Sequence, residues 1–204
     1  MKRLLPEATV CWKVFWQKSG PTRRIGLSRV PSHLRGGRIL DIGCGSVPYF
    51  LLNAEFSHKF GVDKVTYGES QCTLCEERGI HFTDFDFEKE SALPFDDQYF
   101  DTVTMLAVIE HMEPTRLPTM IAEVRRVLKT GGVCIVTTPA PWTDALLKMM
   151  AKLRLVSPVE INEHKATYGR PTMAAAFAAV GFEPAMICSG YFEMLMNVWM
   201  TAQR

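Results

Sequence analysis

The stretch from Leu40 to Ser46 carries residues whose types and spacing suit a bound organic cofactor. It reads LDIGCGS, at the end of a run of apolar residues. The residues in it that could contact a ligand are Asp41, Gly43, Cys44 and Gly45. Glycines directly after a buried strand let a ligand approach the backbone closely and allow positive φ angles. A helix that begins beyond them offers free N–H groups. The pattern predicts a site for a nucleotide-like cofactor.

Three details argue against a dinucleotide in this site. Pro48 stands where the third glycine of a GxGxxG pattern would be. A carboxylate at Asp41 would repel a pyrophosphate, whereas it can accept hydrogen bonds, directly or through water, from the ammonium group of a methionine moiety. S-adenosylmethionine carries no phosphate, and it therefore fits these residues better than NAD.

Further acids follow the next two predicted strands. Asp63, followed by Lys64, comes about 20 residues after the glycines, where an acid can accept both ribose hydroxyls; an acidic helix cap is the alternative. Asp86 can accept from an adenine amino group while Phe87 packs on the ring. Asp84 competes with Asp86 for this role, because the ends of strands are poorly placed from sequence.

Glu110 and His111 follow a predicted strand at 100–106, and therefore belong at the carboxyl edge of the sheet, where ligands bind in open α/β folds. In methyl transfer the cofactor brings the electrophile, so a base is needed only if the acceptor must lose a proton. Glu110, His111, His164 and Tyr168 are the candidates. For the first two, hydrogen bonds that fix a loop are an equally good interpretation; for His164 and Tyr168 we favour loop packing.

Short apolar runs alternate with helical stretches from about residue 37 onward, which predicts an α/β fold with a parallel sheet and helices on both faces. The predicted strands are 38–42, 60–62, 80–85, 100–106, 133–138, 184–189 and 193–202. The predicted helices are 48–57, 68–78, 115–129, 143–153 and 171–180. Gly131 and Gly132 are expected to end the third of these helices.

Length and composition indicate one ordinary globular domain. The chain has 204 residues, of which 47% are hydrophobic, and no apolar run approaches the roughly 20 residues that span a bilayer. We find no secretory signal, and six scattered cysteines suit reduced thiols, so we expect a cytoplasmic protein. Cys72 and Cys75 form a lone CxxC, which we interpret as packing; we expect no metal site.

The small net charge of +1 conceals an uneven distribution. Residues 1–38 contain nine Lys or Arg and one Glu, a net +8, which leaves −7 for the rest. We therefore separate a basic N-terminal extension, 1–35, from a main domain, 36–204. The extension could attract an anionic substrate, a membrane surface or nucleic acid, or form a lid. We favour the simpler interpretation of an arm that packs through Trp12, Phe15 and Trp16.

Taken in order, several stretches between residues 38 and 138 resemble the class I S-adenosylmethionine-dependent methyltransferases, in particular the small type 11/12 group. They are LDIGCGS, the acid of GVDKV, LPFDDQYFD, AVIEHM and VRRVLKTGGVCIVTTP. The segment 163–183 also resembles the region before the sixth strand in that group. Val47 departs from the pattern, since many members have glycine there.

The resemblance implies a Rossmann-like three-layer α-β-α sandwich with a seven-stranded, mostly parallel sheet whose last strand is antiparallel. It implies a methyltransferase (EC 2.1.1.-) that converts S-adenosylmethionine to S-adenosylhomocysteine. The implied cofactor contacts include a position around Ala107. The full predicted set is Asp41, Gly43, Cys44, Gly45, Asp63, Lys64, Asp86, Phe87, Ala107 and His111, with Glu110 and His111 as catalytic candidates.

The acceptor is expected to be a small molecule or a sugar- or lipid-linked metabolite bound by segments outside the common core. Adaptable apolar side chains that could line its pocket, or simply belong to the core, are Trp142, Met149, Met150, Tyr191, Met194 and Met196. The alternatives are a nucleic-acid-directed methyltransferase that uses the basic extension, and a non-catalytic binding module, to which Val47 would point. The oligomeric state stays open.

Overall fold

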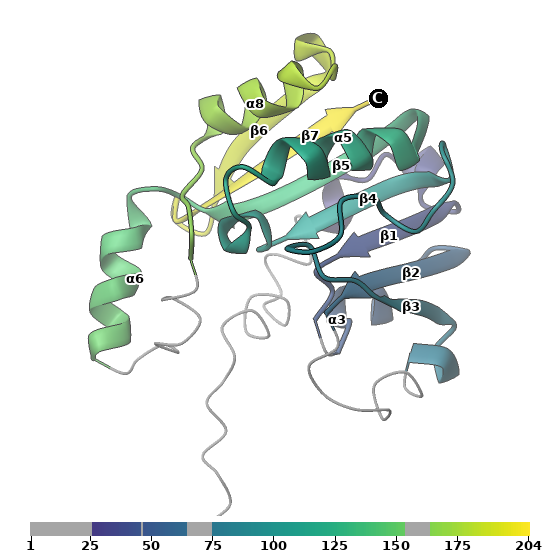
Figure 1. The fold of residues 1–204 in the computed structure, drawn as a ribbon, viewed down its shortest axis with the longest axis horizontal. Coiled ribbons are helices and arrows are strands. Elements are labelled where there is room, and N and C mark those ends of the chain that lie inside the picture. Colours follow the sequence, from purple (N-terminus) through teal and green to yellow (C-terminus); the bar gives the residue numbers. More distant parts are fainter. Residues whose placement is uncertain (1–25, 46, 65–74, 154–163) are drawn as a thin grey trace, which may run out of the picture.

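Seven strands form one sheet in the computed structural model, which describes residues 26–45, 47–64, 75–153 and 164–204. Their order across the sheet is β3-β2-β1-β4-β5-β7-β6 (Figure 1). The strands are β1 Arg38–Ile42, β2 His58–Asp63, β3 Ile80–Asp84, β4 Phe100–Leu106, β5 Leu128–Pro139, β6 Ile187–Phe192 and β7 Asn197–Gln203. β7 is antiparallel to both of its neighbours, β5 and β6, and the other pairs are parallel.

The central strands are buried on both faces, as continuous apolar runs in a parallel sheet should be. In register, Asp41 of β1 lies between Gly61 of β2 and Thr104 of β4. The three strands therefore finish close together, and the loops that follow them meet at one edge of the sheet. This edge is the carboxyl edge at which the sequence predicts the site.

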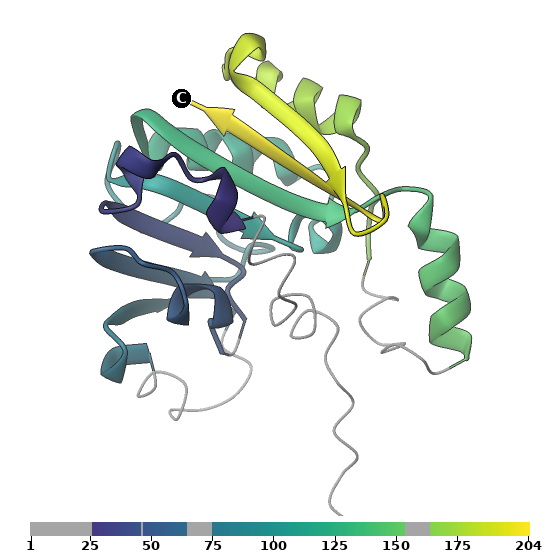
Figure 2. The same cartoon turned by 180° about the vertical axis from the view of Figure 1, so that it is seen from behind.

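Helices cover both faces of the sheet. The helices α5 (Leu117–Val127) and α8 (Arg170–Ala179) lie on one face (Figure 1), and a helix at 26–29 with α3 (Tyr49–Leu52) lies on the other (Figure 2). Each face has its own buried cluster. One contains Val124 and Phe177, and the other Phe50, Leu51 and Ile80. The predicted three-layer α/β fold with an antiparallel last strand is confirmed.

The helix α6 (Thr143–Lys152) follows the carboxyl end of β5 and extends beyond the sheet (Figure 1). It matches the predicted helix 143–153 closely. Within the described ranges, no helix combines the length and the apolar character that crossing a membrane requires.

Two predicted helices are longer than the observed ones. The helix expected at 48–57 is the single turn α3, because the chain leaves helical geometry at Asn53 and β2 begins at His58. The helix expected at 115–129 ends at Val127, because Leu128 is extended and pairs with Phe100 at the start of β5. Gly131 and Gly132 thus lie inside a strand rather than ending a helix.

The C-terminal pair of strands starts later than predicted. Residues 184–186 form a 3-10 turn, η3 (Pro184–Met186), because a proline opens the segment, and β6 follows it. Residues 193–196 form the turn between the strands, with Glu193, Met194 and Leu195 all at positive φ. Of the helix predicted at 68–78, residues 75–77 are helical, and 65–74 lie outside the described residues.

The described part of the basic extension packs on the sheet. Val30 belongs to the buried cluster that contains Phe50, Leu51 and Ile80. The Arg29 guanidinium lies 3.7 Å from the ring centre of Trp199. Residues 1–25, including Trp12, Phe15 and Trp16, lie outside the described residues, as do Cys11 and Cys72. The other four cysteines form no disulfide with one another.

Candidate functional site

The glycine turn after β1 is fixed to the end of β2. The backbone amides of Gly43 and Cys44 donate to the Val62 carbonyl at 2.8 and 3.4 Å. Gly43 and Gly45 have φ angles of 73° and 74°, which favour glycine. A Cβ on Gly43 would also lie 2.5 Å from Cγ2 of Val108, so the turn passes directly against the loop that follows β4.

Asp63 joins the ends of β1 and β2 through its carboxylate. Oδ2 accepts a hydrogen bond of 2.6 Å from the Gly45 amide, and Oδ1 accepts one of 2.8 Å from the Lys64 amide. The side chain stays partly exposed. A partly exposed carboxylate beside a glycine-rich turn is well suited to a ligand that carries hydroxyl groups.

Asp41 occupies a deeper position than the glycines. It is 1% exposed, and Oδ1 accepts a 2.6 Å hydrogen bond from the Thr104 hydroxyl on the neighbouring strand β4. A buried carboxylate is costly unless its neighbours donate to it. Thr104 of β4 therefore holds the Asp41 carboxylate just before the glycine turn, where it could attract a cationic group bound at the turn.

Asp86 follows β3 and is fixed by two donors. Its Oδ2 lies 3.0 Å from the Lys64 ammonium, and its Oδ1 accepts from the Glu88 amide at 3.1 Å. The Lys64 hydrogen bond, with help from the Glu88 amide, lowers the pKa of Asp86. Phe87 packs edge-on against Phe85, with ring centres 5.2 Å apart. The structure thus brings Lys64, Asp86 and Phe87 together.

Asp84, the competing candidate, ends β3 directly opposite Asp63. Its side chain is exposed. Asp84 and Asp86 are therefore both candidates for the predicted adenine contact, and the choice of Asp86 remains a prediction.

The loop after β4 brings the predicted catalytic candidates to the same edge. Ala107 has a φ of 55°, and its amide donates to the backbone and side-chain oxygens of Thr137 at 3.0 and 3.2 Å. The 3-10 turn η2 (Ile109–His111) follows at once. Its Glu110 carboxylate is buried and accepts a 3.0 Å hydrogen bond from the Thr138 hydroxyl at the end of β5.

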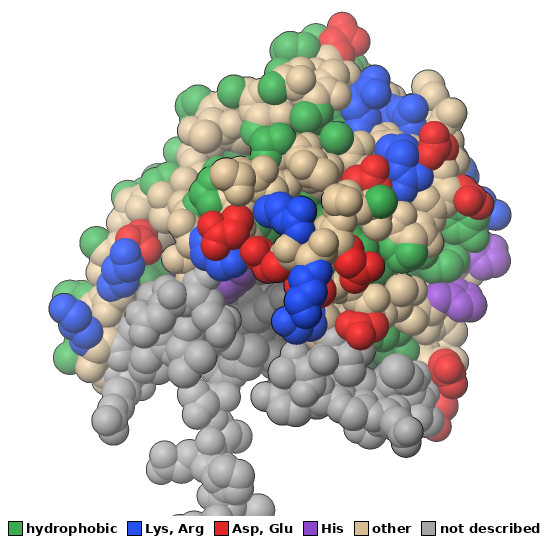
Figure 3. All heavy atoms as spheres, in the orientation of Figure 1, with side chains coloured by type: hydrophobic (Ala, Val, Ile, Leu, Met, Phe, Trp, Pro, Cys, Tyr) green, Lys and Arg blue, Asp and Glu red, His purple; other side chains and the backbone are tan. Residues whose placement is uncertain are grey.

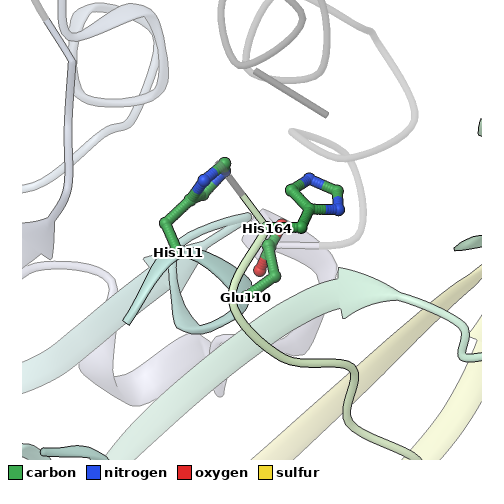
Figure 4. Close-up of side chains that lie close together, drawn as sticks. All are labelled: Glu110, His111 and His164. Atoms are coloured by element: carbon green, nitrogen blue, oxygen red, sulfur yellow. The ribbon is translucent and has the colours of Figure 1, made fainter. Parts of the chain in front are cut away.

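His164 meets this loop from a distant part of the sequence. The amides of Lys165 and Ala166 donate to the Glu110 carbonyl at 2.8 and 3.3 Å, which holds His164 beside η2. The rings of His111 and His164 are 5.0 Å apart between centres (Figure 4). One nitrogen of each imidazole and one oxygen of Glu110 lie within 4.8 Å of one another.

The four candidate bases differ in their surroundings. Burial lowers the pKa of His164, so its imidazole is neutral at physiological pH. Burial raises the pKa of Tyr168, whose hydroxyl is enclosed and has no hydrogen-bond partner among the described residues. Tyr168 is therefore poorly placed to accept a proton. The hydrogen bonds of Glu110 match the loop-fixing interpretation given above.

The apolar side chains proposed for the acceptor lie on the surface. Trp142, Met149, Tyr191 and Met194 are exposed, and Met150 and Met196 are partly buried. They come from α6 with the residues before it and from β6 with its turn. The Trp142 indole donates to the Leu195 carbonyl at 3.1 Å, which connects these two regions.

Sequence reasoning missed the threonines under the site. Thr104, Thr137 and Thr138 are buried, and each donates or accepts a hydrogen bond with a candidate residue. The available signal was the presence of hydroxyl side chains inside the otherwise apolar strands 100–106 and 133–138. It also missed the meeting of His164 with Glu110 and His111.

Residues 40–136 match the family model described as a methyltransferase domain. A probable tRNA methyltransferase 9B from Bos taurus is 35% identical over 98 residues, 48% of this chain and 20% of that protein. The O-methyltransferase rstn1 from Aspergillus nomiae is 32% identical over 116 residues, 54% of this chain and 49% of that protein. The chain thus spans at most about half the length of these relatives.

Solved structures share the fold at low identity. An S-adenosylmethionine-dependent methyltransferase from Mesorhizobium loti superposes with a TM-score of 0.67 at 19% identity, covering 91% of this chain and 99% of that one. The 1,6-didemethyltoxoflavin-N1-methyltransferase of Burkholderia thailandensis, solved with S-adenosylhomocysteine, gives 0.68 at 17% identity, covering 93% and 80%. The matching family model identifies residues 40–136 as a methyltransferase domain, and the likeness to these structures shows that the chain has the fold of the class I S-adenosylmethionine-dependent methyltransferases, whose cofactor is S-adenosylmethionine.

Proposed function

We propose that this chain transfers the methyl group of S-adenosylmethionine to a small-molecule acceptor bound beyond the carboxyl ends of β4 and β5. One observation carries the proposal. The glycine turn and the loop with Glu110 and His111 meet at one sheet edge, where Gly43 leaves no room for a Cβ against Val108. A cofactor on the turn would therefore present its methyl group beside that loop.

The cofactor fits the described residues in three parts. The backbone of Gly43, Cys44 and Gly45 accommodates the methionine moiety, with the charge of Asp41 beneath it. Asp63 accepts the ribose hydroxyls. The single turn α3 is too short to supply the helix N-terminus expected from the sequence, so the carboxylates and the open backbone dominate binding.

At the adenine end, the pair Asp86 and Lys64 borders the ring position and Phe87 supplies an apolar contact. Ala107 and His111 approach from the other side, where the cofactor meets the acceptor. Val47 is partly buried, and a side chain larger than that of glycine at this position would narrow the space at the methionine end.

The transfer itself needs orientation more than acid–base chemistry. The acceptor atom attacks the methyl carbon in line, the carbon–sulfur bond breaks, and its electron pair stays on sulfur to give S-adenosylhomocysteine. Holding the two reactants in line lowers the barrier, because their translational and rotational entropy has already been lost on binding. If the acceptor is a hydroxyl, its proton leaves to His111, the partly exposed imidazole at this edge.

Surface character favours a small, partly apolar acceptor. Large exposed apolar side chains stand on α6 and on the β6–β7 turn, next to the end of β5. Figure 3 shows acidic and basic side chains mixed on the face that it presents. In that region Lys165 pairs with Glu88 and Glu113, and Lys148 pairs with Asp144. Among the described residues of this region, these pairs leave little net positive charge to attract phosphates.

Titration calorimetry with S-adenosylhomocysteine, with NADH as the control ligand, tests the cofactor site. We expect micromolar binding of S-adenosylhomocysteine alone. Asp63→Asn should weaken it on the order of 100-fold, since both ribose contacts depend on the charge. The matched control Asp96→Asn removes an exposed carboxylate remote from the turn and should change nothing. Equal losses in both variants would remove Asp63 from the site.

An acceptor panel with radiolabelled S-adenosylmethionine then tests the transfer. Label should move to phenols, acids or heterocycles that carry an apolar body. Label that stays on the cofactor with every acceptor, in a protein that binds S-adenosylhomocysteine, would favour a non-catalytic binding module.

A nucleic-acid acceptor is the second candidate, because of the relative named a probable tRNA methyltransferase and the basic N-terminal residues. This alternative predicts binding of tRNA that weakens steeply with salt, since each neutralised phosphate releases counterions. A gel-shift experiment at low salt distinguishes the two. No retardation of tRNA would leave the small-molecule acceptor.

A further inference from the structure

Glu110, His111 and His164 form a compact set of metal-ligand types at the acceptor side of the site. Two lie on η2 directly after β4, and the third faces them from the segment before α8 (Figure 4). The backbone amides of residues 165 and 166 donate hydrogen bonds to the Glu110 carbonyl, and these bonds hold His164 beside the other two side chains. One donor atom from each side chain falls within 4.8 Å of the others.

We propose that these three side chains bind one divalent transition-metal cation, which holds an oxygen of the methyl acceptor. Two imidazoles and one carboxylate are a donor set that suits zinc, iron and related ions, whereas magnesium and calcium prefer oxygen ligands. The proposal revises the expectation of no metal site, which considered only the cysteine pair.

The geometry needs a small closure to reach metal coordination. Bonds of about 2.1 Å place neighbouring ligand atoms about 3.0–3.4 Å apart. The observed spread of up to 4.8 Å closes by rotation of the two imidazoles, which are both only partly buried. The Glu110 carboxylate need not move, since the Thr138 hydroxyl already orients it from the side away from solvent.

Electrostatics around the cluster suit a cation. The Glu110 carboxylate is buried, and a cation bound beside it would offset the cost of burying its charged form. The nearby ammonium of Lys165 lies within 3.2 Å of Glu88 and Glu113, so it is engaged away from Glu110.

Three protein ligands leave at least one coordination position open, as in catalytic zinc sites. The acceptor is expected on this side of the sheet edge, so its oxygen can take that position. With His111 bound to the metal, water rather than this imidazole takes the proton of the acceptor hydroxyl, which metal binding makes more acidic. The resulting oxyanion attacks the methyl carbon, and the electron pair of the broken carbon–sulfur bond stays on sulfur. This step rests on the proposed methyl transfer and narrows the acceptors to oxygen nucleophiles.

Cobalt(II) titration of the metal-free full-length protein, followed by visible absorption, tests the site without any need for turnover. We expect one saturable site with d–d bands that are lost in His164→Ala and His111→Ala. The matched control His58→Ala removes an exposed histidine at the opposite end of β2 and should leave the titration unchanged. The proposal would be overturned if cobalt(II) gave no saturable d–d bands with the original protein, or if all three variants lost these bands equally.

A gentler variant guards against unfolding of the histidine variants. Thr138→Val keeps the volume of the side chain but removes the hydroxyl that orients Glu110, and it should weaken cobalt binding about 10- to 100-fold. Unchanged cobalt affinity in Thr138→Val, together with intact affinity in His164→Gln, would refute a role for this cluster.

S-adenosylhomocysteine titration of the same samples separates the two proposals. Cofactor binding without cobalt binding would sink the metal site and leave methyl transfer standing. Cobalt binding without binding of S-adenosylhomocysteine would support the metal site and contradict the proposed methyl transfer.

Discussion

The two halves of the proposed site, one for the cofactor and one for the acceptor, are built in different ways, although they share one sheet edge. The cofactor half, at the ends of β1 and β2, is made of backbone and carboxylates, and Gly45 and Asp63 are linked directly. The acceptor half, at the ends of β4 and β5, is made of side chains from segments far apart in sequence. The first half is constrained by the geometry of the turn, whereas the second depends on how distant loops dock.

This difference explains what each half can tolerate. A turn with positive φ angles and a neighbour at contact distance admits little change, so the cofactor half accepts few substitutions. Exposed apolar side chains on α6 and the β6–β7 turn have few constraints, so the acceptor half can vary while the fold persists. Three predictions test this contrast, in order of expected effect.

The largest effect is expected from Gly43→Ala. The new Cβ would stand 2.5 Å from Val108 at a φ of 73°, so the turn must shift and S-adenosylhomocysteine affinity should fall on the order of 100-fold. Gly79→Ala is the matched control, since its φ is 64° but nothing lies within 4 Å of the new Cβ. Calorimetry should show normal binding for the control. Similar losses in both would mean that backbone strain, not contact with the acceptor loop, sets the affinity.

An intermediate effect is expected beneath the turn. Thr104→Val removes the hydroxyl that donates to Asp41, and leaving that buried carboxylate short of a donor should lower the free energy of unfolding by about 1–3 kcal/mol. Thr102→Val, on the same strand, replaces an equally buried hydroxyl that has no partner among the described residues. Urea unfolding should therefore find the control as stable as the original. A destabilised control would show that both sites respond to shape alone.

The smallest effect is expected in a network remote from both halves, where Arg126 binds Glu123 and the carbonyls of Leu93 and Phe95. The Arg126 hydrogen bond, opposed by burial, lowers the pKa of Glu123. Its contribution is therefore present above the unfolded pKa and is lost as pH falls through the folded value.

Glu123→Gln should remove about 1 kcal/mol of stability at pH 7 and flatten the acid side of the pH–stability curve. Thermal melts between pH 3 and pH 7 measure this, and cofactor affinity at pH 7 should not change. Reduced affinity in Glu123→Gln would show that the 93–98 loop influences the site.

The arrangement of the residues in the proposed cofactor half could be predicted from sequence because it is local. Asp63 ends β2 and Gly45 follows β1, so the parallel pairing of β1 with β2 is enough to bring them together. The acceptor half could be predicted only as separate candidates. The contact between His164 and η2 depends on backbone hydrogen bonds across more than 50 residues, which no periodicity records.

Errors in the fold have a related origin. Glycines usually end helices, so Gly131 and Gly132 suggested a longer α5. The pairing of Leu128 with Phe100 draws the chain into β5 earlier, because a place in the sheet outweighs local preference. Likewise, α3 is shorter than its apolar pattern suggests, since the chain becomes part of strand β2 from His58 onward.

The position of β7 has a consequence for folding during synthesis. β7 lies inside the sheet between β5 and β6, yet it follows both in the sequence. Until residues 197–203 leave the ribosome, β5 presents a row of unpaired N–H and C=O groups, which can recruit strands from other chains. We therefore expect nascent chains that stop short of β7 to depend on chaperones, even though every residue of the cofactor half has already been made.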